Sequence, residues 1–196
     1  MNLSLLKKIS ATFLLSSLGL VMIQANAPAA LSFEIPESLS VPNGQTLLLK
    51  SKAKGDQIYT CKAISSDSSG YGNQPDTYQW TLKAPEAVLF NAKGVQKGKH
   101  YLGPTWEWQD GSKVQGKVKI KVDAPDAQSI PWLLLEAKQP TDQKTDTRGV
   151  LSPVQWVQRL NTAGGKAPKT GCDRPNQNQE IRVLYTADYY FYGNRP

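Results

Sequence analysis

The segment KHYLGPTWEWQDGSKV (99–114) contains the side chains of this sequence best suited to chemistry. His100, the only histidine of the chain, precedes two carboxylates, Glu107 and Asp110. An imidazole with a near-neutral pKa can transfer protons at physiological pH, and a nearby carboxylate can share acid–base work. These three residues are therefore the catalytic candidates, for a secreted hydrolase that uses His100 with Glu107 or Asp110.

The same segment supports a second hypothesis, ligand binding without catalysis. His100, Tyr101 and Glu107 offer an imidazole, a phenol and a carboxylate to a glycan or another small polar ligand. The chain contains no G-x-S-x-G elbow, no complete G-x-x-x-x-G-K-[ST] phosphate loop and no G-x-G-x-x-G dinucleotide loop. A non-enzymatic binding protein is therefore favoured over the hydrolase, and neither hypothesis is excluded.

Two neighbouring features have simpler structural interpretations. Trp106 and Trp108 alternate with polar residues, which predicts a strand with both tryptophans in the core and Glu107 facing outward. The Asp-Gly pair that follows is typical of a hairpin turn. His100 is left without an equally simple structural role.

Short β-type runs predict the fold that must position these residues. Prolines are spread along the chain, so few windows are long enough for a regular helix. Glycine-containing turn sequences separate the runs, which predicts one antiparallel β-sandwich or barrel of roughly ten short strands. The predicted strands are Thr46–Lys50, Gln57–Lys62, Tyr78–Leu82, Ala87–Phe90, Thr105–Gln109, Lys113–Val122, Trp132–Ala137, Val154–Leu160, Ile181–Tyr185 and Tyr189–Tyr192.

Three segments are less regular. SPVQWVQRL (152–160) fits a strand, but its Ser-Pro start also fits the first turn of a helix. The polar stretches 65–76 and 138–149 are rich in turn-forming or charged residues and predict surface loops.

The strand SKVQGKVKIKVD (112–123) has strict alternation. One face carries Val114, Gly116, Val118, Ile120 and Val122, and the other carries Lys113, Gln115, Lys117, Lys119 and Lys121. A lysine face of this kind is typical of a solvated outer surface that also discourages edge pairing. A binding stripe for an anionic polymer is the alternative.

Residues 1–29 have the organisation of a cleaved secretory signal peptide. Two lysines precede the apolar run Ile9–Ile23, and small residues follow it. The run is short for a membrane span, so we expect cleavage between Ala27 and Leu31 and no stable membrane anchor afterwards. The remaining residues, 30–196, are predicted to form a single β domain that is exported, either periplasmic or secreted.

Cys61 and Cys172 are the two cysteines of the chain. In an exported protein the expected arrangement is one disulfide between them, with two free thiols or a metal site as alternatives. One histidine and two distant cysteines lack the spacing of a zinc site. We therefore expect no metal and no other cofactor.

The formal net charge of +7 falls to +5 when the two lysines of the signal segment are removed (7 − 2). This modest basic balance could favour anionic glycans or membrane surfaces, but it bears mainly on solubility. The sequence has no arginine-rich run and no recognition-helix pattern, so no nucleic-acid partner is expected. The oligomeric state is left open.

Several motifs resemble a family of exported bacterial and fungal proteins catalogued as a domain of unknown function. They are VPNGQTLLLK, QIYTCK, HYLGPTWEWQDGSKVQGKV, IPWLLLEA, VQRLNTAGGKAP, GCD and YTADYYFY, and the similarity extends from about Pro36 to Tyr192. The His-Tyr and Gly-Pro-x-Trp-Glu elements of the family match His100, Tyr101, Gly103, Pro104, Trp106 and Glu107. The resemblance implies no reaction and no established catalytic residues. Some fungal relatives are labelled malate dehydrogenase, but this sequence has neither a dinucleotide loop nor a βαβ pattern to support that label.

Overall fold

The structure, a computed structural model, describes residues 34–64, 77–140 and 149–194. The predicted signal segment and the first polar loop lie outside these residues, as does most of the second loop, so those predictions are untested. The helical elements in the described part are two short 3-10 turns, η1 (Glu37–Leu39) and η2 (Arg174–Asn176). None of its helices is long and apolar enough to cross a membrane.

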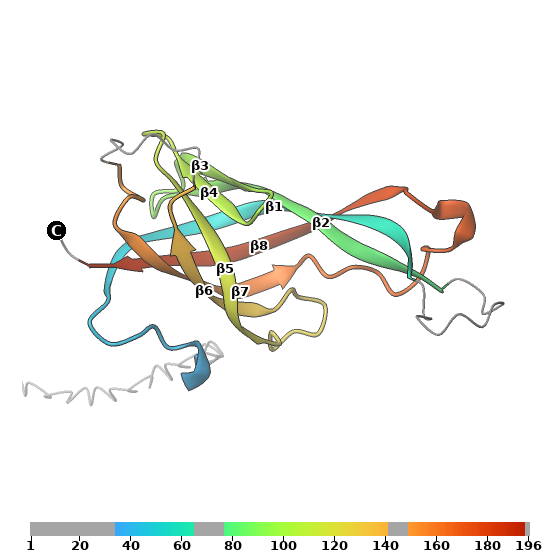
Figure 1. Cartoon of the computed structure of the whole chain (residues 1–196), viewed down its shortest axis with the longest axis horizontal. Coiled ribbons are helices and arrows are strands. Elements are labelled where there is room, and N and C mark those ends of the chain that lie inside the picture. The colour runs from blue at the N-terminus through green and yellow to red at the C-terminus, as the bar shows by residue number, and fades with distance from the viewer. Residues whose placement is uncertain (1–33, 65–76, 141–148, 195–196) are drawn as a thin grey trace, which may run out of the picture. The chain divides into compact units, whose positions relative to one another are not determined.

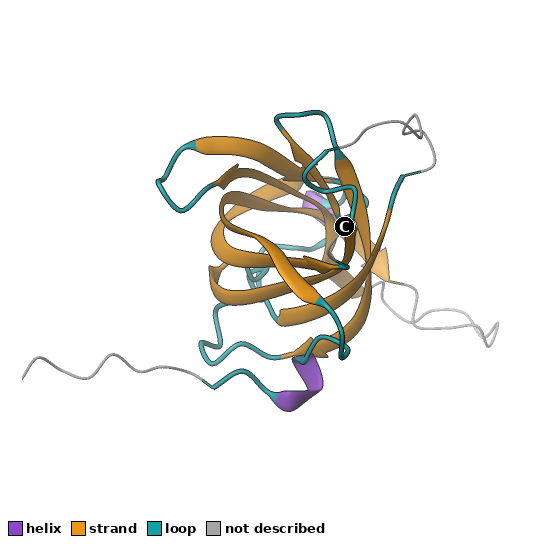
Figure 2. Cartoon of the chain, turned by 90° about the vertical axis from the view of Figure 1, so that its left-hand side faces the viewer, coloured by secondary structure: helices purple, strands orange, loops and turns teal. Residues whose placement is uncertain are grey.

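Eight strands form one closed antiparallel sheet (Figures 1 and 2). Each strand pairs with the next along the chain, and β1 pairs with β8, so the sheet has no end. The antiparallel all-β prediction is confirmed, and the fold is a barrel. The strands are β1 (Thr46–Ile64), β2 (Thr77–Phe90), β3 (Gln96–Tyr101), β4 (Thr105–Trp108), β5 (Lys113–Val122), β6 (Trp132–Lys138), β7 (Val154–Gly164) and β8 (Glu180–Gly193).

The ten predicted strands become eight because three pairs of them merge and one strand was missed. β1, β2 and β8 each contain two predicted runs as a single long strand. Pro85 does not break β2, since β2 pairs with β3 only beyond it, from Ala87 to Phe90. The missed strand is β3, whose lysines and glycine resemble a loop but which pairs with β2 and β4. The ambiguous segment 152–160 is a strand from Val154 onward.

Aromatic side chains dominate the inside of the barrel. Trp106, Tyr189 and Phe191 are at most 1% exposed. The Trp106 ring meets Tyr189 and Phe191 edge to face, with centroids 5.3 and 6.0 Å apart. Trp108 is also buried, so the prediction of two core tryptophans is confirmed.

A second apolar cluster covers the outer face of β6 and β7. Leu39 of η1 packs there against Trp132, Leu134 and Leu160. The Gln158 amide donates a buried hydrogen bond of 2.7 Å to the Leu39 carbonyl. The segment that precedes β1 is thereby fixed to the sheet, and the outward side chains of these strands are covered.

The hairpin of β3 and β4 is much shorter than the strands beside it. β2 pairs with β3 only over Ala87–Phe90, and β4 pairs with β5 only over Lys113–Gln115. Among the described residues, the facing edges of β2 at 77–86 and of β5 at 117–122 therefore have no strand between them. The wall of the barrel is open at this point.

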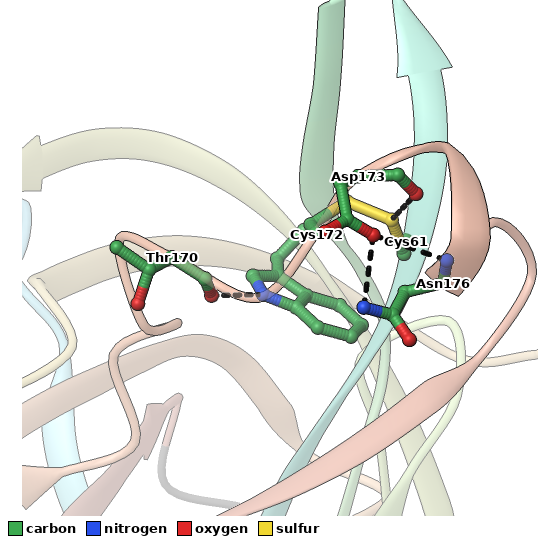
Figure 3. The surroundings of a disulfide bond; sticks show 6 residues. Cys61, Thr170, Cys172, Asp173 and Asn176 are labelled. Atoms are coloured by element: carbon green, nitrogen blue, oxygen red, sulfur yellow. Dashed lines mark hydrogen bonds between the residues drawn. A yellow bond between two sulfur atoms is a disulfide. The ribbon is translucent and has the colours of Figure 1, made fainter.

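The disulfide joins Cys61, near the end of β1, to Cys172 in the connection between β7 and β8 (Figure 3). The predicted pairing is confirmed, and the alternatives of free thiols and a metal site are excluded for these cysteines. Trp80 packs beside the bond and donates from its indole nitrogen to the Thr170 carbonyl at 3.0 Å. Asp173 caps η2 by accepting from the Asn176 backbone. These contacts hold the β7–β8 connection against β1 and β2.

Replacing both cysteines, as Cys61→Ala with Cys172→Ala, should lower the free energy of unfolding by about 4–5 kcal/mol, because the bond closes a loop of about 110 residues. Urea denaturation monitored by tryptophan fluorescence measures this loss. Reductant should shift the wild-type curve toward that of the variant and leave the variant unchanged. A wild-type midpoint that is insensitive to reductant would contradict the prediction.

Candidate functional site

Strand alternation separates the candidate residues onto two faces of the sheet. On β3, His100 lies opposite Trp106 of β4 and points into the barrel. Tyr101 and Glu107 point outward, where the Tyr101 hydroxyl donates to the Glu107 carboxylate at 2.8 Å. The structure therefore brings together two of the three predicted ligand-binding residues and places the third on the opposite face.

His100 is an interior side chain that is 2% exposed. Its ring stacks on Trp106 with centroids 4.5 Å apart and planes 12° from parallel, and Tyr189 meets its edge. Nδ1 lies 2.9 Å from the Thr105 carbonyl oxygen, which can only accept, so Nδ1 carries the hydrogen and Nε2 is an acceptor. The pKa of His100 is lowered to about 3, chiefly by burial; the hydrogen bond to the Thr105 carbonyl acts to raise the pKa, and the charge of the Arg159 guanidinium acts to lower it. The imidazole is thus neutral at physiological pH.

Glu107 belongs to a small charged cluster on the outer face. Besides the hydroxyl of Tyr101, its carboxylate meets the ammonium groups of Lys99 at 3.4 Å and Lys113 at 3.7 Å. Partial burial acts to raise the pKa of Glu107, but the hydrogen bonds from Tyr101 and Lys99 and the two lysine charges lower it overall. Glu107 is therefore an ionised partner in a surface network.

Asp110 holds the β4–β5 turn and the segment before β7. Gly111, with φ of 83°, supplies the left-handed residue of the predicted hairpin turn. The Asp110 carboxylate accepts from the Ser112 amide at 2.9 Å, from its hydroxyl at 2.6 Å, and from the Val150 amide at 2.8 Å. Burial acts to raise the pKa of Asp110, but these hydrogen bonds lower it. The three catalytic candidates thus have separate roles and do not converge.

A cavity of about 590 Å³, which we call the mouth cavity, lies at the opening between β2 and β5. Its inner end includes the buried side chains of Gln57, His100, Trp106 and Tyr189. The outer end includes Leu82 and Val118, which are 52% and 47% exposed, so the cavity reaches the surface. Most of the remaining lining is apolar and includes Pro85, Ile130, Pro131, Leu133 and Leu135.

Arg159 of β7 also lines the mouth cavity and was not among the predicted site residues. It lies opposite Leu133 of β6 and Tyr189 of β8, which are both interior residues. Its Nε and Nη2 atoms donate to the Pro131 carbonyl at 3.0 and 2.9 Å, which holds the side chain in place. In the sequence, Arg159 stands two residues after Val157, and residues two apart in a strand lie on the same face. This spacing could have identified Arg159 as an inward side chain.

Lys121 does not lie on the outer lysine face that was predicted for this strand. A bulge between Val118 and Ile120 shifts the register of β5, so that Lys121 lies opposite the interior residue Leu133 and lines the mouth cavity. Lys119, at the bulge, remains outside and pairs with Glu136 at 3.1 Å. The strict alternation predicted for this strand is therefore wrong beyond the bulge.

The β7–β8 connection supplies another wall of the mouth cavity through Lys166 and Ala167. The Tyr59 hydroxyl donates to the Gly165 carbonyl at 2.7 Å, which fixes the start of this wall. The disulfide at Cys172 fixes it a few residues later. Within the residues that the structure describes, no cluster of three or more histidine, cysteine or acidic side chains is placed to hold a metal ion.

His100→Gln should remove an acid-dependent loss of stability. The unfolded chain binds a proton at His100 near pH 6.5, whereas the folded chain binds it only near pH 3. Stability therefore falls as the pH drops from about 6.5 toward 3, by up to about 1.4 kcal/mol per pH unit. Above pH 7 the variant should be the less stable protein, because it loses the stacking on Trp106. Urea unfolding at a series of pH values should show this difference shrinking with acid, and parallel profiles would count against a buried neutral imidazole.

The comparisons with known proteins give a family without a biochemical activity. Neither the curated proteins nor the solved structures include a match to this chain. One family model, described as "Protein of unknown function (DUF3455)", matches residues 42–193. This range contains all eight strands, both cysteines and every residue that lines the mouth cavity. The chain therefore belongs to the DUF3455 family.

Proposed function

We propose that this chain is a non-enzymatic binding protein that holds one small molecule in the mouth cavity. The observation that carries the proposal is the cavity itself, about 590 Å³ in volume, apolar along its walls and polar at its buried end. Ligand sites are commonly concave, mostly apolar and supplied with a few polar groups, and they occur in the mouths of β-barrels. An eight-stranded barrel is wide enough to hold one small ligand.

The geometry gives less support to a hydrolase based on His100. An imidazole with a pKa of about 3 is a poor general base, since it has little affinity for the proton it would have to accept. The carboxylates of Glu107 and Asp110 are held by Tyr101 and Ser112 in other parts of the structure. His100 contributes to the proposed site as a neutral wall of the cavity whose Nε2 atom can accept a hydrogen bond.

The lining favours a ligand that combines a polar group with an apolar body. A glycan exposes hydroxyl groups in most directions, whereas Leu133, Leu135 and Ile130 offer no hydrogen bonds. Aromatic or aliphatic molecules could contact these side chains while their polar end meets Gln57 and Arg159. The lining thus favours a small amphipathic molecule over the glycan that was one of the two ligand classes expected from the sequence.

We further propose that the protein functions outside the cytoplasm, in the periplasm or as a secreted protein. The Cys61–Cys172 bond supports this location, because disulfides persist in oxidising compartments. The signal-like segment at 1–29 supports it independently. Cell fractionation with alkylation of free thiols tests it: recovery of oxidised chain outside the cytoplasm is expected, and reduced cytoplasmic chain would count against export.

The neutral fluorescent probe N-phenyl-1-naphthylamine tests the proposed binding site. Its flat apolar body should enter the mouth cavity. The fluorescence of the probe should therefore increase when the wild-type protein is added. Val118→Trp places an indole at the outer end of the cavity and should weaken binding by about tenfold or more, because the probe and the indole compete for the same space.

Val95→Trp is the matched control, since Val95 is 50% exposed and does not line the mouth cavity. This variant should bind the probe as the wild type does. Absence of binding by the wild-type protein, or equal binding by both variants, would contradict the proposal.

A further inference from the structure

We infer that the ligand of the mouth cavity is a small organic anion, with an apolar or aromatic body and one carboxylate-like group that faces Arg159. The inference rests on the proposed binding function and adds to it the charge of the ligand. It is drawn from the Arg159 charge, from buried donors that lack acceptors, and from the other charges around the cavity.

Arg159 brings a positive charge into the barrel without a negative partner. No carboxylate in the described parts of the chain lies within ion-pair distance of its guanidinium. The Pro131 carbonyl occupies only Nε and one hydrogen of Nη2, so three guanidinium N–H groups face other partners, of which the Tyr189 hydroxyl is a neutral one. A partly buried cation costs free energy unless an anion compensates it. A planar guanidinium is also well matched to a carboxylate or similar anion.

Three other side chains that line the cavity have buried polar atoms without a well-formed hydrogen bond. They are Gln57 through Nε2, Trp106 through Nε1 and Tyr189 through its hydroxyl, and none of them makes a hydrogen bond of good geometry among the described residues. The Tyr189 hydroxyl has only weaker contacts, with Arg159 and Tyr185, and Gln57 has one with Tyr185. Each of these side chains is at most 1% exposed. The amide and indole nitrogens can only donate, and a phenol donates readily, so an acceptor is the group that this end of the cavity lacks.

Tyr189 of β8 and Arg159 of β7 lie opposite each other in the sheet, and their side chains interact. Burial raises the pKa of Tyr189, and the charge of Arg159 acts in the opposite direction on this phenol. The same guanidinium influences His100 and Tyr59, which also line the cavity. The positive charge of Arg159 thus acts on several side chains at the inner end of the cavity, where the buried donors also lie.

The charged side chains nearer the surface are also positive on balance, like Arg159. Lys83, Lys121 and Lys166 line the cavity, and Asp123 is the one carboxylate among the described residues that line it. Lys83 is neutralised by Glu180 at 2.6 Å, whereas the Lys121 ammonium group has no ion-pair partner among the described residues. Neutral His100 adds no charge. An anion would therefore pass a basic rim before it reaches Arg159.

A neutral polar ligand satisfies these observations less well. It could accept hydrogen bonds from Gln57 and Trp106, but it would leave the Arg159 charge uncompensated. Hydrogen bonds to a charged group are roughly twice as strong as those between neutral groups. An anionic group with several acceptor lone pairs could meet Arg159, Tyr189 and Gln57 together, while the apolar walls contact the rest of the molecule.

Two probes with the same aromatic ring system separate the inference of an anionic ligand from the proposal of a binding function. N-phenyl-1-naphthylamine is neutral, and 8-anilinonaphthalene-1-sulfonate carries a permanent sulfonate on the same ring system. The wild-type protein should bind the sulfonate about tenfold more tightly or better, from its charged hydrogen bonds. Arg159→Gln should remove most of this preference, because it weakens binding of the sulfonate by a much larger factor than binding of the neutral probe, and the binding of the neutral probe that remains shows that the cavity is intact.

Two further variants serve as control and as second test. Lys93→Gln removes one positive charge from the β2–β3 turn, outside the residues that line the cavity, and should leave both affinities unchanged. Lys121→Gln should weaken binding of the sulfonate by a smaller factor than Arg159→Gln, and by a larger factor than it changes binding of the neutral probe. If Arg159→Gln does not fold, the Lys121→Gln result carries the test.

The outcomes distinguish the inference from the function on which it rests. Equal binding of both probes by the wild type would overturn the anion inference and leave the binding function standing. An equal loss of sulfonate binding in Lys93→Gln and Arg159→Gln would also overturn it, because the attraction would then be a general surface effect. Binding of neither probe would contradict the binding function itself.

Discussion

Pairing of β1 with β8 is the interaction on which the rest of the structure depends. It closes the sheet, so that the inward side chains of eight strands share one interior. His100, Trp106, Arg159 and Tyr189 come from four different strands and meet only because of this closure. The shortness of the β3–β4 hairpin then leaves part of the wall open, and the barrel acquires an interior that is accessible from the surface.

The fold could be predicted largely from local patterns. Turn residues, prolines and two-residue alternation indicated an antiparallel all-β domain, and the alternation of Trp106 and Trp108 correctly identified buried residues. The disulfide followed from the number of cysteines and the expected compartment. The number of strands was less accessible, because a strand such as β3 is stabilised by its partners rather than by its own composition.

The candidate site could be predicted only in part from the sequence, because it depends on contacts between strands that are distant along the chain. His100 was identified as unusual, but its burial depends on Tyr189, which is distant in sequence. The position of Lys121 depends on a bulge, and a bulge reverses every later side chain of the strand without a clear sequence signal. Arg159 gains its significance because no carboxylate of the described residues serves as its counter-ion, a relation that depends on the three-dimensional structure.

Besides stabilising the fold, the disulfide can affect the equilibrium of ligand binding. The bond ties down the β7–β8 connection, and this same connection forms a wall of the mouth cavity. A ligand that requires the wall in place therefore binds the oxidised protein better than the reduced protein. Because such coupling is reciprocal, a bound ligand must favour the oxidised form by the same factor. Under the proposed binding function, occupancy of the cavity and the redox state of Cys61 and Cys172 would therefore be coupled equilibria.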